Sequence, residues 1–148
     1  SFTNPNLEAF YRRGGKLISW HGWTDQIVPV QSTIDYYESV ERFMGREKTR
    51  EFYRMYLAPG VDHCRGGAGP DSFGVSYDEP PIVDAEHDML TAIVEWVESG
   101  KAPRRLIASK VVDGKVTMTR PLCPYPQVVK YKGGGDPNDA ANFTCADP

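Results

Sequence analysis

Two side chains in this sequence have the types and the order that general acid-base chemistry requires. Asp25 follows one short apolar run, and His63 follows a second apolar run and the turn-forming pair Pro59-Gly60. A carboxylate that holds one nitrogen of an imidazole fixes the tautomer, so the other nitrogen is available as a general base. The two residues therefore predict an acid-base pair, provided that the fold brings them together.

Each residue near this pair also has a simpler interpretation. A loop histidine can bond to backbone, and an aspartate in the pattern Asp-x-x-x-Pro can cap a turn. Asp62 is a rival acid, but its position next to His63 disfavours contact with the ring, so we expect it to be structural. His21, at the end of the first apolar run, is expected to be a hydrogen-bonded strand-end histidine. No paired spacing typical of zinc ligands is present, so no metal site is predicted.

The elements that must position Asp25 and His63 form a βαβ unit. Leu17 to Trp20 and Phe52 to Leu57 are apolar runs of strand length, and the second is expected to be buried on both faces. The apolar residues from about Ser32 to Met44 recur at helical spacing, and Gly45 is expected to end this helix. Such a unit has parallel strands and a right-handed crossover. The carboxyl ends of parallel strands share one sheet edge, where open α/β sheets carry their chemistry. An acid followed by a histidine is also the order found in α/β-hydrolase triads.

Two further elements are expected after the histidine. Asp84 is predicted to cap a helix that ends at Gly100. The apolar face of this helix is expected to consist of Met89, Leu90, Ile93, Val94 and Val97. Asp113-Gly114 lies between the runs 106–112 and 115–120 and predicts a β-hairpin with a two-residue turn. From Pro121 onward we expect an irregular tail. No repeat or linker divides the sequence, so residues 1–148 are predicted to belong to one α/β domain.

Charge, hydropathy and cysteine count restrict the partners. The net charge of -3 gives no electrostatic reason for binding nucleic acid or an anionic membrane, and no apolar run approaches the roughly 18 residues of a spanning helix. Three cysteines are an odd number, and Cys123 with Cys145 is the economical disulfide within the tail. In an oxidising compartment Cys64 then needs a partner outside this chain. The triplet that begins at Asn142 is a glycosylation acceptor, which agrees with secretion.

Several long stretches resemble the tannase and feruloyl esterase family of secreted serine esterases. These stretches are 21–25, 35–37, 59–64, 120–126 and 131–145; they occur in the same order and together cover most of the chain. The resemblance implies the C-terminal portion of an α/β-hydrolase fold, with a parallel βαβ unit, a further helix, a β-hairpin and a disulfide-stapled tail. It also implies cleavage of galloyl, feruloyl or related aromatic acyl esters by a triad of serine, aspartate and histidine.

Carried over by position, the resemblance assigns the acid to Asp25 and the base to His63. It implies that Cys64 is bonded to a cysteine beside the nucleophilic serine. No Gly-x-Ser-x-Gly pattern occurs, and the nearest approach, around Ser72, has proline in place of the first glycine. The serine, the oxyanion-hole donors and a lid that holds calcium in relatives are therefore expected outside this chain, in a contiguous or disulfide-linked N-terminal portion. No cofactor is predicted within the chain itself.

The predicted function is thus extracellular hydrolysis of aromatic acyl esters, with this chain supplying only Asp25 and His63 and inactive by itself. The alternative is a catalytically silent structural or interaction domain that lacks the serine. Aromatic residues near the predicted site are expected to pack in the core rather than line an acyl pocket; they are Trp20, Trp23, Tyr36 and Tyr37.

Overall fold

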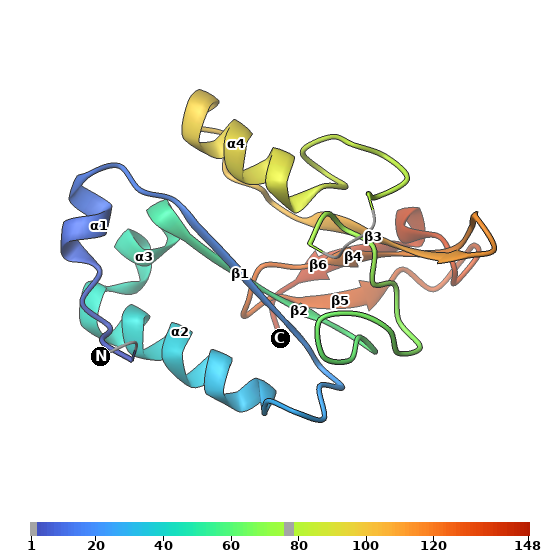
Figure 1. Ribbon diagram of the computed structural model, residues 1–148, viewed down its shortest axis with the longest axis horizontal. Helices are drawn as coiled ribbons and strands as arrows, with labels where there is room; N and C mark the ends of the chain where they lie inside the picture. Colours follow the sequence, from blue (N-terminus) through green and yellow to red (C-terminus); the bar gives the residue numbers. More distant parts are fainter. Residues whose placement is uncertain (1–2, 76–78) are drawn as a thin grey trace.

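The computed structural model describes residues 3–75 and 79–148 and has an α/β fold (Figure 1). In chain order the elements are α1 (Glu8–Arg12), β1 (Leu17–Gly22), α2 (Val30–Met44), α3 (Arg46–Phe52), β2 (Tyr53–Ala58), α4 (Met89–Ser99), β3 (Leu106–Val112), β4 (Lys115–Leu122), β5 (Val128–Tyr131), the 3-10 helix η1 (Ala140–Asn142) and β6 (Phe143–Ala146). The described strands pair as β1-β2, β3-β4 and β5-β6.

The predicted βαβ unit is present. β1 and β2 are parallel, with Leu17 opposite Tyr53 and Gly22 opposite Ala58. α2 connects them and ends, as predicted, at Gly45, which has a φ of 87°. The short helix α3 follows at once and was not predicted, because most of its residues are charged.

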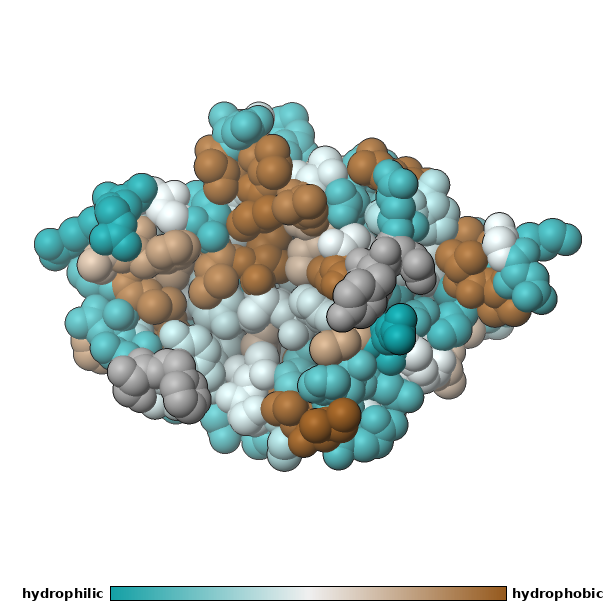
Figure 2. All heavy atoms as spheres, viewed as in Figure 1, coloured by the Kyte–Doolittle hydropathy of each residue, from teal (hydrophilic) through white to brown (hydrophobic). Residues whose placement is uncertain are grey.

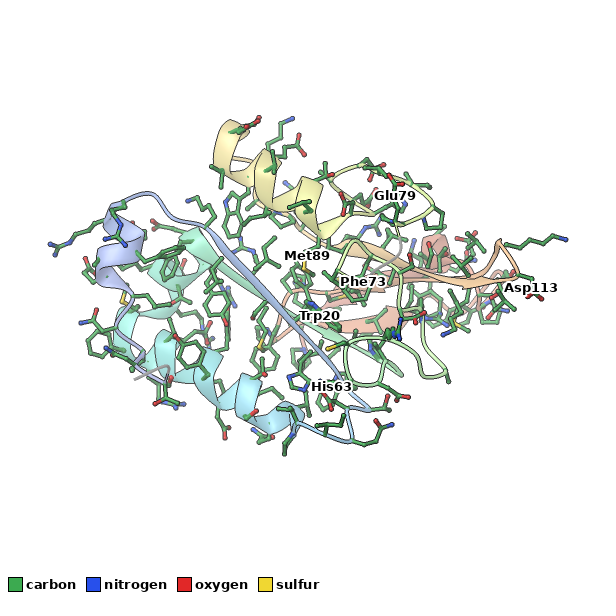
Figure 3. All side chains as sticks on the ribbon, in the orientation of Figure 1. Trp20, His63, Phe73, Glu79, Met89 and Asp113 are labelled. Carbon is green, nitrogen blue, oxygen red and sulfur yellow. A yellow bond between two sulfur atoms is a disulfide. The ribbon has the colours of Figure 1, made fainter. Side chains whose placement is uncertain are left out.

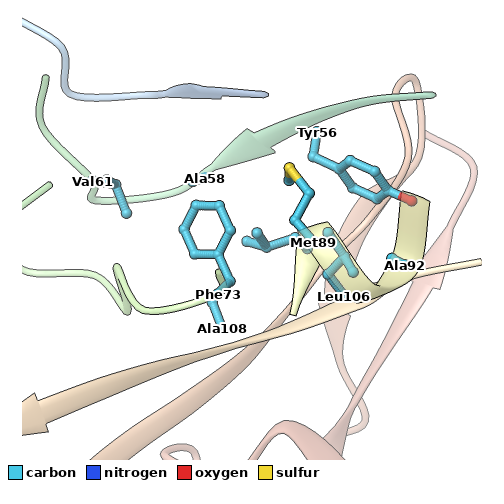
Figure 4. Packing of buried hydrophobic residues seen from close by; sticks show 9 residues of the cluster. Tyr56, Ala58, Val61, Phe73, Met89, Ala92, Leu106 and Ala108 are labelled. Carbon is cyan, nitrogen blue, oxygen red and sulfur yellow. The ribbon is translucent and has the colours of Figure 1, made fainter. Parts of the chain in front are cut away.

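β2 is the central element of the hydrophobic core, and its two faces serve different parts of it. Tyr56 and Ala58 belong to a cluster with α4, β3 and β4, part of which is seen in Figure 4. Tyr53 and Met55 belong to a second cluster that contains the buried face of α2 and Phe52. Successive side chains of a strand point to opposite faces. The predicted burial of this strand on both faces is therefore confirmed.

The helix after the histidine begins later than the sequence predicted. Asp88, not Asp84, is the N-cap of α4, and its carboxylate accepts hydrogen bonds from the backbone N–H groups of Leu90 and Thr91. The Asp84 carboxylate instead closes a separate turn by accepting from the N–H groups of Glu86 and His87. Two capping aspartates four positions apart are both compatible with the local sequence, and the extended backbone at Asp88 decides between them.

The apolar face predicted for α4 is only partly buried. Met89, Ala92 and Trp96 are buried against the core. Leu90, Val94 and Val97 are exposed by 65%, 44% and 60%, and Figure 2 shows apolar atoms gathered over this helix. We refer to these three exposed residues as the outer stripe of α4. The helix thus has apolar residues on two faces, and the described residues cover only one of them.

The region after α4 is more regular than predicted. β3 and β4 form the expected antiparallel hairpin around Asp113 and Gly114, which both have positive φ as a type I′ turn requires. The tail, expected to be irregular, contains the antiparallel pair β5-β6. The expected disulfide between Cys123 and Cys145 joins this pair to the end of β4. None of the described helices has the length and apolar character needed to cross a membrane.

Candidate active site

Asp25 and His63 meet just beyond the carboxyl ends of β1 and β2. Nδ1 of His63 lies 2.8 Å from Oδ2 of Asp25. Because a carboxylate can only accept, Nδ1 carries the proton and Nε2 is the acceptor nitrogen of the ring. The Asp25 side chain is 5% exposed and the His63 side chain is 40% exposed. Figure 3 shows the His63 side chain near the ends of the two strands. The contact predicted from the sequence is therefore present.

The turn at Pro59-Gly60 sets the register that brings the two residues together. Paired residues of β1 and β2 are 36 positions apart (53 minus 17), whereas Asp25 and His63 are 38 apart. The N–H of Val61 returns to the carbonyl of Ala58, at 3.3 Å, and closes a turn in which Gly60 has a φ of 71°. Proline at the second position and a left-handed glycine at the third are typical of a type II turn. This turn shifts the pairing by the two positions required.

A second contact joins the same two loops beside the first. The Thr24 hydroxyl donates to Oδ1 of Asp62 at 2.8 Å, again between residues 38 positions apart. Asp62 thus holds the loops together, in agreement with the structural role expected for it. The loops approach so closely at Gly22 that a Cβ there would lie 2.2 Å from the carbonyl oxygen of Val61. Glycine is therefore required at this position by the close approach of another backbone.

The Asp25 carboxylate is held in its ionised form. Its Oδ1 accepts hydrogen bonds from the backbone N–H groups of Ile27, at 2.8 Å, and Val28, at 2.9 Å. Burial acts to raise the pKa of Asp25, but the hydrogen bonds from Val28, His63 and Ile27 together outweigh it and lower the pKa from 3.8 to about 2. The acid is therefore charged throughout the neutral range, as an orienting residue for a histidine must be.

His21 is a hydrogen-bonded residue at the end of β1, as expected. Its Nδ1 lies 2.7 Å from the Thr33 hydroxyl, and its Nε2 lies 3.0 Å from the carbonyl oxygen of Val28. The same Nε2 is 3.1 Å from Oδ2 of Asp25, a contact that the sequence reasoning missed. Four-residue spacing between a strand-end histidine and a loop aspartate was the available signal. Among the described residues no group of three or more histidine, cysteine, aspartate or glutamate side chains could hold a metal ion.

Comparison with known proteins connects this chain to one family. A family model described as tannase and feruloyl esterase matches residues 1–146. The chain belongs to the tannase and feruloyl esterase family.

Individual members of the family resemble this chain over nearly all of its length. It is 43% identical to mono(2-hydroxyethyl) terephthalate hydrolase of Piscinibacter sakaiensis, over 99% of this chain and 22% of that protein. It is 42% identical to a probable feruloyl esterase of Arthroderma benhamiae, over 97% of this chain and 25% of that protein. The crystal structure of an esterase from Aspergillus oryzae matches with a TM-score of 0.91 and 32% identity, over 97% and 29% of the two chains. The chain thus spans about a quarter of the length of these relatives.

Three other residues with a role predicted or ruled out from the sequence are Cys64, Ser72 and Asn142. Cys64, next to His63, is exposed and lies outside the Cys123–Cys145 disulfide. Ser72 pairs through its backbone with Ser109 and is not on a turn between a strand and a helix. This placement agrees with the expectation that it is not the nucleophile. Nδ2 of Asn142 donates to a backbone carbonyl, and glycosylation there stays a prediction.

Neither of two hollows on the surface includes both members of the pair. The larger, of about 1180 Å³, is lined by Tyr37, Arg54 and Arg104 among others, and contains neither Asp25 nor His63. A smaller one, of about 170 Å³, is lined in part by Trp23, Leu57 and Pro59. Neither of these two hollows is lined by Asp25 or His63.

The aromatic residues near the site do not all pack as predicted. Tyr37 is buried, and the ring of Trp20 packs on the ring of Phe73 with 5.0 Å between the ring centroids. Trp23, in contrast, is 49% exposed, so its predicted burial in the core is wrong. Its place in the loop that carries Asp25 explains the difference, because this loop leaves the sheet toward solvent.

Proposed function

We propose that this chain is the part of an ester hydrolase of the tannase and feruloyl esterase type that supplies the acid and the base of a serine, aspartate and histidine triad. The hydrogen bond between His63 Nδ1 and Asp25 is the observation that carries the proposal. It leaves Nε2 as the proton acceptor, and no described residue hydrogen-bonds to that nitrogen.

In the proposed reaction Nε2 of His63 removes the proton of a serine hydroxyl while the serine oxygen attacks the ester carbonyl. Asp25 stabilises the imidazolium that forms. The ring then gives the proton to the departing alcohol oxygen as its bond to the acyl carbon breaks, which leaves an acyl-serine. In the second half His63 takes a proton from water, the water oxygen attacks the acyl group, and the proton returns to the serine as the carboxylic acid leaves.

The nucleophile is proposed to lie on sequence outside these 148 residues. Two features of the fold support a further part that docks beside β1. Among the described residues no strand pairs with the outer edge of β1, whereas the outer edge of β2 receives a hydrogen bond of 2.8 Å from the Tyr125 N–H. Unpaired strand edges are templates for further strands. The chain would then be the C-terminal portion of an α/β-hydrolase fold.

The outer stripe of α4 supports the same docking. Leu90 and Val97 are 65% and 60% exposed on a helix that already buries its opposite face in the core. Apolar patches of this kind mark surfaces that another part of a protein covers. Because the chain spans about a quarter of its relatives, we propose that the portion carrying the serine covers the stripe and extends the sheet from β1.

The proposed substrate is an ester of an aromatic carboxylic acid, and the proposed location is extracellular. Relatives are named for feruloyl and terephthalate esters, both of which contain an aromatic acyl group. The disulfide between Cys123 and Cys145 is typical of proteins from oxidising compartments. In such a compartment Cys64, exposed beside His63, is proposed to bond to a cysteine near the serine.

The test uses the complete enzyme, in which this chain is combined with the portion that supplies the serine. His63→Ala should abolish hydrolysis of an alkyl ferulate, whereas His87→Ala should not. His87 is a matched control because it also pairs with a carboxylate, Asp84 at 2.7 Å, but outside the candidate site. A serine-directed phosphonate should label a residue outside the 148 positions. Hydrolysis that survives His63→Ala, or no hydrolysis and no labelling at all, would favour the silent structural domain instead.

A further inference from the structure

The residues that support the Asp25 carboxylate include one histidine to which the proposed reaction gives no role. We propose that His21 is a positioning residue that fixes Asp25 in the orientation required by His63, an inference that rests on the function proposed above. His21 itself does not contact the reacting atoms, because the Asp25 carboxylate lies between its ring and that of His63.

The contacts of His21 reach both the acid and the loop that carries it. Its Nε2 donates to the carbonyl oxygen of Val28, at 3.0 Å, and lies 3.1 Å from Oδ2 of Asp25. The N–H of the same residue, Val28, donates to the other carboxylate oxygen, Oδ1, at 2.9 Å. His21 therefore holds the carbonyl of Val28, whose N–H fixes Oδ1 of Asp25, and its Nε2 lies beside Oδ2.

The part of the loop before Asp25 is held by the Thr24 contact with Asp62 and by backbone hydrogen bonds, whereas the part after Asp25 has little apolar anchoring. Ile27 and Val28 are exposed by 72% and 38%, so their side chains contribute little apolar anchoring to the core. The side chains of His21 and Asp25 are by contrast only 10% and 5% exposed. In this part of the loop the fixed groups are thus the polar ones, and His21 is a side-chain donor that connects them to β1.

Both ring nitrogens of His21 have a hydrogen-bond partner. The carbonyl oxygen of Val28 can only accept, so Nε2 carries a proton. On the other side, the hydroxyl of Thr33 in the first turns of α2 lies within hydrogen-bonding distance of Nδ1, at 2.7 Å. One ring, 10% exposed, thus connects β1, the loop of Asp25 and α2, and its Nε2 lies beside Oδ2 of Asp25.

Three variants of the complete enzyme separate the donor from the bulk of the ring. His21→Leu removes the N–H donor at position 21. His21→Asn keeps an amide donor on a shorter side chain, which is expected not to reach the carbonyl of Val28. His21→Gln places an amide N–H near the position of Nε2. We expect kcat for an aromatic acyl ester to fall about 10²-fold in the first two, as for a small misplacement of a reacting group, with KM unchanged. The Gln variant should retain most of the wild-type kcat.

A spectroscopic measurement distinguishes positioning from a general loss of structure. The Nδ1 proton of His63, hydrogen-bonded to Asp25, should give a downfield proton NMR signal that is lost in His21→Leu and kept in His21→Gln. His87→Gln serves as the control and should change neither kcat nor this signal. The proposal is overturned by a normal kcat and signal in the Leu variant, or by a Gln variant as impaired as the Leu variant.

These outcomes also separate this inference from the proposed function. If His63→Ala leaves activity intact, the catalytic role of His63 fails. The downfield signal would still report whether His21 orients the carboxylate, because it is measured without substrate.

Discussion

Replacement of Asp25 by asparagine tests the acid-base pair most directly, because the hydrogen bonds around the carboxylate determine how the amide must lie. One carboxylate oxygen accepts from the backbone N–H groups of Ile27 and Val28, and the other from Nδ1 of His63. An amide has a single acceptor oxygen. It can satisfy the two backbone donors or the histidine, but it cannot satisfy both.

The amide oxygen of Asp25→Asn is expected to face the two backbone donors, because the reverse orientation would set an NH₂ group against two N–H groups. The NH₂ group then faces Nδ1 of His63, which must give up its proton to become the acceptor. The proton moves to Nε2, and the ring can no longer act as the base. By analogy with the same change in a serine protease triad, kcat should fall by about 10⁴.

The assay is steady-state hydrolysis of an alkyl ferulate by the complete enzyme, combined with nitrogen NMR shifts that report the tautomer of His63. Asp62→Asn is the matched control. Its amide oxygen can still accept from the Thr24 hydroxyl, so kcat should remain close to that of the wild type. Equal losses in the two variants, or a normal tautomer with high turnover in Asp25→Asn, would refute the assignment of Asp25.

Three more predictions concern stability and the approach of the loops. The pKa of Asp25 is lowered in the folded chain, so its stabilising contribution is present above pH 3.8 and is lost as the pH falls toward about 2. In an acid-denaturation experiment the free energy of unfolding of Asp25→Asn should therefore fall less across this pH window than that of the wild type. In Gly22→Ala the new Cβ would lie 2.2 Å from a carbonyl oxygen, so turnover should drop and unfolding should require about 1–3 kcal/mol less, whereas Gly134→Ala, with no atom within 4 Å of its Cβ, should be tolerated. Replacing Cys123 and Cys145 together by serine removes a crosslink over 22 positions and should lower the free energy of unfolding, measured by denaturant titration, by about 3 kcal/mol.

The parts of the fold that could be predicted from the sequence are those specified by local patterns. The apolar runs of β1 and β2, the end of α2 at Gly45 and the Asp113-Gly114 hairpin each depend on a few adjacent residues. α3 escaped prediction because its charged sequence lacks an apolar repeat, although Thr49 and Phe52 at its inner face are buried. The pair β5-β6 escaped because prolines and glycines surround two strands of only four residues each.

The outer stripe of α4 illustrates a limit of hydrophobic periodicity. The pattern correctly indicated an apolar helix, but it placed the buried Met89 on one face with Leu90, Val94 and Val97, which are exposed. It did not include Ala92 and Trp96, which are buried. A helix with two apolar faces gives one broad signal, and periodicity does not tell which face meets which partner. Only the packing of α4 on the described residues separates the two faces.

The sequence could predict that Asp25 and His63 form a pair, but not how the two loops that carry them are aligned. Knowing that β1 and β2 are parallel places Asp25 and His63 at the same edge, yet strict continuation of the strand pairing would set Asp25 opposite position 61 (25 plus 36). Val61 is apolar and fully buried, so an unshifted loop would leave the acid without its histidine. The turn at Pro59-Gly60 advances the second loop by two positions, which sets Thr24 opposite Asp62 and Asp25 opposite His63. The stretch that stops the strand is therefore also the stretch that aligns the acid with the base, and each function accounts for the proline and glycine found there.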